Sequence, residues 1–477
     1  MILRDLSWVA KATQGVLVGN PIVIRGVSTD SRNVGEGNLF VPIIGDVFNG
    51  HQFVSGAMDR GAVAFLWGKS EPMPDELKEV PHVVVEDTLS ALQSLASAYR
   101  HELPMKVVGV TGSNGKTTTK EMIALILSER YRTYRSPGNL NNHIGLPLSL
   151  LQIPEDTEVA VFEMGMNHAG EIARLAEIAK PDAGVITMIG EAHIGNLGSR
   201  AAIAKAKWEL IDALPSGGVA FLPKDEPLLQ SLIVPAGVDT FYFGENEDAD
   251  ARISNYEAMP PNGAAMEVDV GKRLGVAHLH IKLPFPGKHL ALDALVASSV
   301  AMWFGLSADE AFRALSGYQM DGMRLAVMPL GERLYLINDA YNAAPSSIEG
   351  ALKVMGDLKV DVRIAVLGDM LELGEHAEEL HRKVGAMLNG YGIEELIAVG
   401  DMSHWYIQGA TEKSKNMHIY AASDAVVAAD FLIPRITAHL MQGKTCAVLV
   451  KGSRKIGLER VAKAILAVFP DHESLSR

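Results

Sequence analysis

Residues 107–119 read Val-Val-Gly-Val-Thr-Gly-Ser-Asn-Gly-Lys-Thr-Thr-Thr, an apolar run that leads into a small polar loop and then into a helix-forming segment. This order is typical of a loop that binds phosphate through backbone N–H groups and a helix N-terminus. We predict a strand over 106–110 and a helix from Thr118 to about Arg130. In such a loop Lys116 would contact the β- and γ-phosphates of a nucleotide, and the Thr117 hydroxyl would contact Mg²⁺.

The whole loop is therefore a predicted ATP site. Its members are Thr111, Gly112, Ser113, Asn114, Gly115, Lys116, Thr117 and Thr118. The strict pattern for such loops has Gly six residues before the Lys, where this chain has Val110. The alternative is an ordinary strand–turn–helix junction that contains Gly-Lys-Thr by chance.

Composition indicates a soluble multidomain enzyme. The 477 residues suffice for about three domains, and the net charge of −14 disfavours a general surface for nucleic acid or anionic membranes. Cys446 is the only cysteine, which excludes an internal disulfide and fits a reducing compartment. The longest apolar run, 290–306, is interrupted by Asp293 and is short for a membrane span. We expect a cytoplasmic protein without membrane insertion.

The order of predicted elements indicates an α/β protein. Residues 1–103 read as a small α/β domain, with a strand at 83–85 and a helix over 88–100. Residues 104–318 alternate strands and helices, which predicts a doubly wound parallel sheet of the P-loop type. Its strands are predicted at 106–110, 159–162, 183–189 and 219–222, its helices at 171–180, 199–214 and 289–304, with shorter strand-like pieces within 240–285.

Residues 319–477 read as a second doubly wound, Rossmann-like unit. Strands are predicted at 334–338, 363–367, 395–399 and 446–450, separated by helical stretches. The three predicted domains are thus 1–103, 104–318 and 319–477.

Polar side chains follow several strands of the middle domain. Ligands of doubly wound sheets bind at the carboxyl ends of strands. Glu163 ends one predicted strand and is a candidate Mg²⁺ ligand. The alternative is a solvated carboxylate that caps the strand. His193 lies in a glycine-flanked loop after another strand, and its type alone does not decide between a ligand and a structural histidine.

Lys207 occupies an unusual place on the helix predicted over 199–214. Ile203, Leu210, Ile211 and Leu214 form one apolar stripe, and Lys207 falls inside it. An inward lysine must snorkel, form an ion pair, be chemically altered, or serve a metal or phosphate site. The stretch 138–145, Gly-Asn-Leu-Asn-Asn-His-Ile-Gly, reads either as a ligand-shaped polar loop or as a cluster of turns.

Together these motifs resemble the Mur ligase family, which builds the peptide of bacterial cell-wall precursors. The resemblance covers nearly the whole chain. It is carried by Gly109–Thr118, Gly138–Gly145, Glu163–Asn167, His193, Lys207, Arg324, Asn338–Asn342 and the stretch Gly-Asp-Met-Leu-Glu-Leu-Gly at 368–374. It implies three domains, of which the first holds the UDP end of a substrate, the second binds ATP and metal, and the third closes over them.

The resemblance also implies roles for single residues. The catalytic residues would be Lys116, Lys207, Arg324 and His193, with Arg324 reaching the γ-phosphate and Lys207 carried as a carbamate. The metal ligands would be Thr117, Glu163 and His193. Further ATP contacts would be Asp293, Asp339 and Asn342. Substrate contacts would be Ser31, Arg32 and Asn49, the first two in Thr-Asp-Ser-Arg and the third within 45–51, together with Asn139, Asn141 and Asn142.

Three positions depart from the family pattern. Leu290 and Asp293 stand where the family usually has Asn, and Asn49 stands where Asp is common. Asp293 could still accept a hydrogen bond from the exocyclic amine of adenine. Candidates for the acceptor-amine pocket of the third domain are Asp369 and the segment 451–454, which could instead simply start the last helix.

The motifs most resemble the family member that joins D-alanyl-D-alanine to UDP-N-acetylmuramoyl-tripeptide with ATP and Mg²⁺, through an acyl phosphate. We expect a monomer. Two further readings stay open: another amide ligase, either a different Mur ligase or a folylpolyglutamate-type synthase, and a P-loop switch that binds nucleotide without ligation. The sequence does not indicate the third residue of the acceptor peptide.

Overall fold

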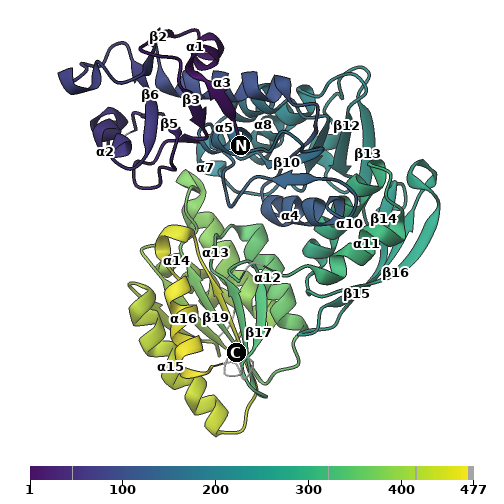
Figure 1. Ribbon diagram of the computed structural model, residues 1–477. Helices are drawn as coiled ribbons and strands as arrows, with labels where there is room; N and C mark the ends of the chain where they lie inside the picture. The colour runs from purple at the N-terminus through teal and green to yellow at the C-terminus, as the bar shows by residue number, and fades with distance from the viewer. Residues whose placement is uncertain (46, 321, 414–415, 471–477) are drawn as a thin grey trace.

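The computed structural model describes residues 1–45, 47–320, 322–413 and 416–470 (Figure 1). In Figure 1 the C-terminal part, green to yellow, lies below the N-terminal and central parts. Each of the three parts contains its own major sheet. The predicted α/β class with three parts is confirmed. Among the described residues, none of the helices combines the length and the apolar character that crossing a bilayer requires.

The N-terminal part is built on a five-stranded sheet. Its strands, in spatial order, are β2 (Val16–Val18), β7 (His82–Val85), β6 (Ala62–Gly68), β5 (Asn38–Phe40) and β4 (Val27–Ser28). A small pair, β1 (Leu3–Asp5) and β3 (Val23–Arg25), lies beside it, with α1 (Leu6–Thr13) and α2 (Val54–Met58). The predicted strand at 83–85 is β7, and the predicted helix is α3 (Thr88–Glu102).

The central part contains a nine-stranded sheet. Its spatial order is β9 (Thr133–Arg135), β10 (Val159–Glu163), β8 (Lys106–Thr111), β11 (Ala183–Ile186), β12 (Val219–Pro223), β13 (Asp239–Gly244), β14 (Ala251–Ala258), β15 (Ala264–Val270) and β16 (Ala277–Leu283). The strands from β9 to β14 run parallel. β15 and β16 add to the edge antiparallel, so the strand-like pieces within 240–285 extend the same sheet.

Helices cover this sheet. They are α4 (Lys116–Leu127), α5 (Gly145–Leu151), α6 (Glu171–Ala179), α7 (Ile194–Leu197), α8 (Arg200–Asp212), α9 (Pro227–Gln230), α10 (Lys288–Trp303) and α11 (Ala308–Ala314). The central strand β8 is buried from its second residue onward, and β10 is buried throughout. Strands covered on both faces read as continuous apolar runs, which is why the sequence revealed them.

The C-terminal part has a six-stranded sheet. Its order is β17 (Ala326–Pro329), β18 (Leu334–Asp339), β22 (Cys446–Lys451), β19 (Val362–Gly368), β20 (Glu395–Val399) and β21 (His418–Ala422). All of these strands are parallel except β17. The helices are α12 (Pro345–Asp357), α13 (Ala377–Met387), α14 (Ser403–Lys413), α15 (Ala425–Met441) and α16 (Glu459–Val468). The proposed domain limits fall between α3 and β8 and between α11 and β17.

Candidate active site

The loop between β8 and α4 is shaped by two glycines. Gly112 has φ +152°, and a Cβ atom there would lie 1.8 Å from Thr187 Oγ1. Gly115 has φ +82° and caps α4, and a Cβ atom there would lie 2.4 Å from Asp293 Oδ1. Neither position accommodates a side chain. Helix α4 begins directly after Gly115, at Lys116, which is two residues before the predicted start at Thr118.

Lys116, Thr117 and Glu163 meet at the carboxyl ends of β8 and β10. Lys116 Nζ donates to the Gly112 carbonyl at 2.8 Å, so the lysine folds back over the loop. Burial, together with Arg324 nearby, lowers the Lys116 pKa, and Glu163 opposes this shift. Thr117 Oγ1 donates to Glu163 Oε2 at 2.6 Å. Since β8 and β10 are parallel neighbours, the predicted hydroxyl and carboxylate lie together.

An asparagine loop forms another wall of this pocket. Asn139, Asn141 and Asn142 line it with the phosphate loop and Glu163. Asn141 Nδ2 donates to Glu163 Oε1 at 2.6 Å. Asn142 Oδ1 accepts from the backbone N–H of Gly145 at 2.8 Å at the start of α5. The stretch 138–145 thus lines the candidate site, and the side chain of Asn142 also stabilises the start of α5.

His193 reaches the same pocket from the loop before α7. Its backbone is left-handed, with φ +65°. Its Nδ1 lies 2.6 Å from Glu372 Oε2 of the C-terminal part, and this contact holds the Glu372 pKa below its usual range. The structure therefore brings Thr117, Glu163 and His193 to one pocket.

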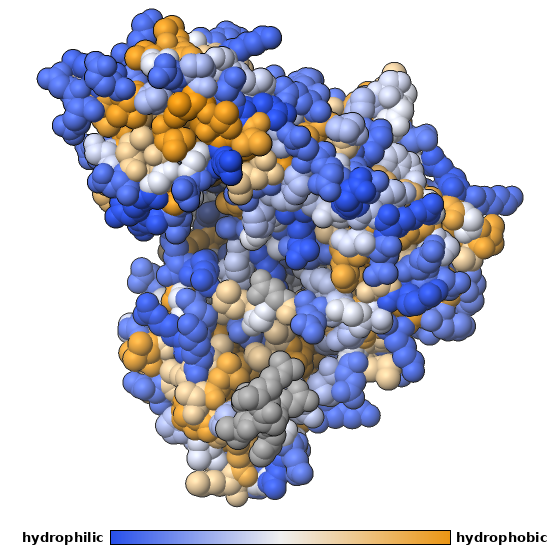
Figure 2. Space-filling view, viewed as in Figure 1, coloured by the Kyte–Doolittle hydropathy of each residue, from blue (hydrophilic) through white to orange (hydrophobic). Residues whose placement is uncertain are grey.

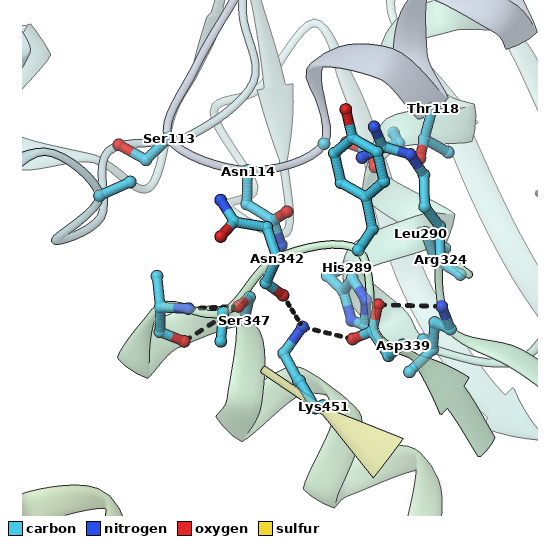
Figure 3. A pocket seen from close by; sticks show the side chains of 17 residues that line it. Ser113, Asn114, Thr118, His289, Leu290, Arg324, Asp339, Asn342, Ser347 and Lys451 are labelled. Atoms are coloured by element: carbon cyan, nitrogen blue, oxygen red, sulfur yellow. Dashed lines mark hydrogen bonds and ion pairs between the residues drawn. The ribbon is translucent and has the colours of Figure 1, made fainter. Parts of the chain in front are cut away.

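The C-terminal part closes a second pocket beside the phosphate loop. Figure 3 shows Lys451 between Asp339 and Asn342. Lys451 Nζ lies 2.5 Å from Asp339 Oδ2 and donates to the Asn342 carbonyl at 2.9 Å. Asn114 and Asp293 line this pocket from the central part. The predicted ATP contacts of the third domain thus face the phosphate loop, and Figure 2 shows the recess between the two parts.

Arg324 lies where these pockets meet and lines both. Its guanidinium carbon lies 3.7 Å from the centroid of the Tyr341 ring, a close cation–π contact. Tyr341 was not predicted as a site residue, although it lies inside the quoted stretch 338–342. The presence of an aromatic residue among the polar residues of this motif could have indicated that Tyr341 belongs to the site.

Lys207 is buried on the inner face of α8, as its spacing predicted, with 1% of its surface exposed. Burial, with Lys116 nearby, lowers its pKa far below the usual value. Across the described part of the chain, the structure records no hydrogen bond or ion pair for its ammonium group. Snorkelling is thereby excluded, since the head group is not in solvent.

Two of the predicted ATP contacts, Asp293 and Thr111, are buried. Asp293 is 7% exposed on α10 and points at Gly115, and burial raises its pKa well above the usual value. Thr111 is fully buried beneath the loop, and it is not among the described residues that line the two pockets.

The predicted contacts for the nucleotide-sugar lie in the N-terminal part, away from these two pockets. Arg32 is exposed and pairs with Asp30 at 2.9 Å, next to Ser31. Asn49 Nδ2 donates to Glu71 Oε2 at 2.8 Å. Among the described residues lining the two pockets, none comes from this set. Residue 46, within the quoted stretch 45–51, lies outside the described residues.

The candidates for the acceptor-amine pocket have structural contacts. Asp369 is buried and accepts the backbone N–H groups of Asp401 and Met402 at 2.9 and 3.1 Å. Ser453 Oγ accepts from Leu371 N at 2.9 Å. Both side chains therefore shape the loop around 369–374. Residues 454–456 form a 3₁₀ turn before α16, and Lys451 belongs to the pocket of Figure 3.

The pocket at Glu163 suits Mg²⁺. Within the described ranges, no group of three or more His, Cys, Asp and Glu side chains is arranged to hold a metal ion. Mg²⁺ in nucleotide sites, however, commonly takes one or two protein oxygens and fills its shell with phosphate and water. The Thr117 hydroxyl and the Glu163 carboxylate, 2.6 Å apart beside a phosphate loop, are such a donor set.

Comparison with known proteins gives a family for all three parts. Residues 110–301 match the Mur ligase middle domain, residues 323–454 the Mur ligase glutamate ligase domain, and residues 23–100 the catalytic domain of the Mur ligase family. The chain is 39% identical to the UDP-N-acetylmuramoyl-tripeptide–D-alanyl-D-alanine ligase of Bacillus subtilis, with 98% of this chain and 99% of that protein covered.

Solved structures of similar proteins support the same family. MurF from Acinetobacter baumannii superposes with a TM-score of 0.88 at 29% identity, covering 98% of this chain and 99% of that one. MurF ligase from Thermotoga maritima, solved in complex with ADP, has a TM-score of 0.80 at 29% identity, covering 92% and 96%.

Proposed function

We propose, because the chain belongs to the Mur ligase family, that it uses ATP to join D-alanyl-D-alanine to UDP-N-acetylmuramoyl-tripeptide. The observation that carries this proposal is the convergence of two parts of the chain on one phosphate loop. Lys116, Thr117 and Glu163 come from the central part, and Arg324 and Asn342 approach from the C-terminal side. The acceptor and the dipeptide are those that the name of the similar Bacillus subtilis ligase gives.

The reaction would proceed in two displacements. A carboxylate oxygen of the tripeptide attacks the γ-phosphorus of ATP, and the bond to ADP breaks. The amine of D-alanyl-D-alanine then attacks the acyl carbon and loses a proton, and inorganic phosphate leaves. The side chains perform little covalent chemistry, so their contribution is positioning and electrostatic stabilisation.

Lys116 and Arg324 would neutralise charge on the phosphoryl oxygens during transfer. Both are cations at the pocket, and Tyr341 holds the Arg324 guanidinium against its ring face. Thr117, Glu163 and His193 would hold Mg²⁺. When bound, Mg²⁺ supplies further positive charge at the β- and γ-phosphate oxygens.

Lys207 would act as a carbamate. Its lowered pKa favours the neutral amine, which is the form that adds CO₂. The carbamate is an anion. The positive charge of Lys116, which disfavours the ammonium form of Lys207, would stabilise this anion.

Several ligand contacts are proposed on the same basis. Asp339, Asn342 and Asp293 would contact the nucleoside of ATP, and Asn139 and Asn141 the acceptor peptide. Ser31, Arg32 and Asn49 would contact the UDP end. We place the reaction in the cytoplasm, where ATP is available, and expect a monomer, because one chain supplies every part of the site.

A substrate-omission assay tests the function. Phosphate release is measured with ATP, Mg²⁺, UDP-N-acetylmuramoyl-tripeptide and D-alanyl-D-alanine, and again with each component omitted. The proposal predicts release, with the amide product visible by mass spectrometry, when all four are present. Release that continues without either peptide would indicate a nucleotide switch or hydrolase, and turnover with folates in place of the UDP-peptide would indicate a folylpolyglutamate-type ligase.

A further inference from the structure

The stretch 368–374, Gly-Asp-Met-Leu-Glu-Leu-Gly, has no role in the chemistry above, yet it crosses to the central part. In Figure 1 the green segment before α13 reaches up to α7. The Gly195 N–H donates to the Glu372 carbonyl at 3.1 Å. Glu372 therefore contacts residues 193–195 through both its backbone and its side chain, since Glu372 Oε2 also lies 2.6 Å from His193 Nδ1.

The backbones pack without room for a side chain. A Cβ atom on Gly195 would lie 2.4 Å from Gly374 N, and one on Gly374 would lie 2.8 Å from Gly195 Cα. Real Cβ atoms do not approach backbone this closely, and backbone cannot rotate away as a flexible side chain does. The contact thus depends on glycine on both sides.

Two strained residues meet at this contact. His193 has φ +65° and Glu372 has φ +64°, the left-handed region that non-glycine residues rarely adopt. Such a backbone conformation is strained and persists where the surroundings enforce it, commonly at functional sites. Here the two strained residues touch each other across the boundary between two parts of the molecule.

We propose that Glu372 is a positioning residue for His193, delivered when residues 372–374 dock on residues 193–195. This inference rests on the proposed function, in which His193 is a metal ligand. A carboxylate close to Nδ1 favours the proton on that nitrogen, restricts the orientation of the ring, and leaves Nε2 for the metal. Docking of the C-terminal part thereby completes the metal site, so the site is assembled only in the closed arrangement.

Four variants test this proposal, of which Glu372→Gln is the conservative one. Glu372→Ala removes the carboxylate, whose side chain is 52% exposed and contributes little to a core. Gly195→Ala keeps the carboxylate but blocks the docking. Glu375→Ala is the matched control, because Glu375 is an exposed carboxylate directly after this segment and lines a separate surface pocket. Mn²⁺ affinity is measured from free Mn²⁺ by electron paramagnetic resonance, with a non-hydrolysable ATP analogue present.

We expect Mn²⁺ affinity to fall roughly 10- to 100-fold in Glu372→Ala and Gly195→Ala and to stay unchanged in Glu375→Ala, because partners of metal ligands typically have effects of this size. The kcat should fall with it, while KM for the UDP-peptide stays within about twofold. Glu372→Gln should recover part of the loss, because its amide oxygen can take the place of the carboxylate oxygen that lies 2.6 Å from Nδ1.

Wild-type Mn²⁺ affinity in Glu372→Ala would overturn the positioning role, and wild-type affinity in Gly195→Ala would overturn the docking. An equal loss of Mn²⁺ affinity in Glu375→Ala would also overturn the positioning role, because the effect would then come from the removal of any nearby negative charge. The proposed function fails separately, if the wild-type chain does not form the amide, because the Mn²⁺ comparison does not require turnover.

Discussion

Lys116 is the residue on which phosphoryl transfer depends most in this account. Its ammonium is the cation closest to the loop, held at 2.8 Å by the Gly112 carbonyl. Lys116→Met should lower kcat roughly 100- to 1000-fold, the usual effect of removing one donor that stabilises transition-state charge. Lys106→Met is the control, because Lys106 is exposed at the far end of the same strand. Near-normal ADP formation in Lys116→Met would contradict this role.

Lys207 offers a second test at the residue scale. Lys207→Ala should lose activity, and short carboxylic acids such as acetate should restore part of it by replacing the carbamate anion. Lys205→Ala, an exposed lysine of the same helix, should remain active without added acid. Turnover is measured at increasing acetate concentration. Full activity of Lys207→Ala in the absence of acetate would show that the buried amine serves packing alone.

Asp293 predicts a pH dependence of stability. Its pKa is raised in the folded chain, so the folded state binds this proton more tightly than the unfolded state. The resulting stabilisation is complete below the unfolded pKa, near 3.8, and is lost as pH rises through the folded pKa. Asp293→Asn, a neutral isostere, should lack this loss.

As pH rises between the two pKa values, the wild type should lose about 1.4 kcal/mol of unfolding free energy per pH unit relative to Asp293→Asn. Denaturant titrations at several pH values measure the difference. A constant difference from pH 4 to pH 8 would contradict the assignment of a protonated Asp293.

At the scale of elements, the phosphate loop requires a left-handed residue without a side chain at its junction with α4. Gly115→Ala should weaken ATP binding more than 10-fold, because it adds backbone strain and pushes on Asp293. Gly170→Ala is the matched control: Gly170 also caps a helix, at φ +87°, and a Cβ atom there would meet no atom of the described residues within 4 Å. That variant should lose about 1 kcal/mol of stability and keep its ATP affinity, which calorimetry measures. Equal losses in affinity would show that the contact with Asp293 is irrelevant.

The buried elements were readable from sequence, and the amphipathic edges were not. β10 and β12 are continuous apolar runs, and α8 has a clear helical stripe. β16 lies within 240–285, where strand-like pieces are predicted without limits for each strand. It alternates exposed and half-buried residues, among them the exposed His278 and His280, because it is an edge strand with one solvated face. β17 and β21 are not predicted at all, since they are edge strands of the C-terminal sheet with few fully buried positions.

The candidate site was predictable where one motif supplies several residues. The phosphate loop with Glu163 follows from strand ends in a parallel sheet. The partnership of His193 with Glu372 could not be predicted, because it joins residues of two different sheets through a contact of loops. The same holds for Asp293 under Gly115, where a helix of distant sequence packs against the loop.

At the scale of the whole molecule, a chain of net charge −14 must bind anionic ATP and an anionic UDP-peptide. Lys116, Arg324 and Lys451 supply local positive charge in the recess between the central and C-terminal parts. Closing this recess over the substrates would exclude water, which otherwise hydrolyses an acyl phosphate. The division of the site between two parts of the chain thus follows from the chemistry proposed for it.

Oxygen transfer tests the acyl phosphate most directly. UDP-N-acetylmuramoyl-tripeptide labelled with ¹⁸O in its reacting carboxylate is ligated to D-alanyl-D-alanine with unlabelled ATP, and the released phosphate is examined by mass spectrometry. If the acyl phosphate forms, one labelled oxygen per turnover moves into phosphate, because the carboxylate oxygen bonded to phosphorus leaves with it. Phosphate free of ¹⁸O, alongside normal amide formation, would contradict it.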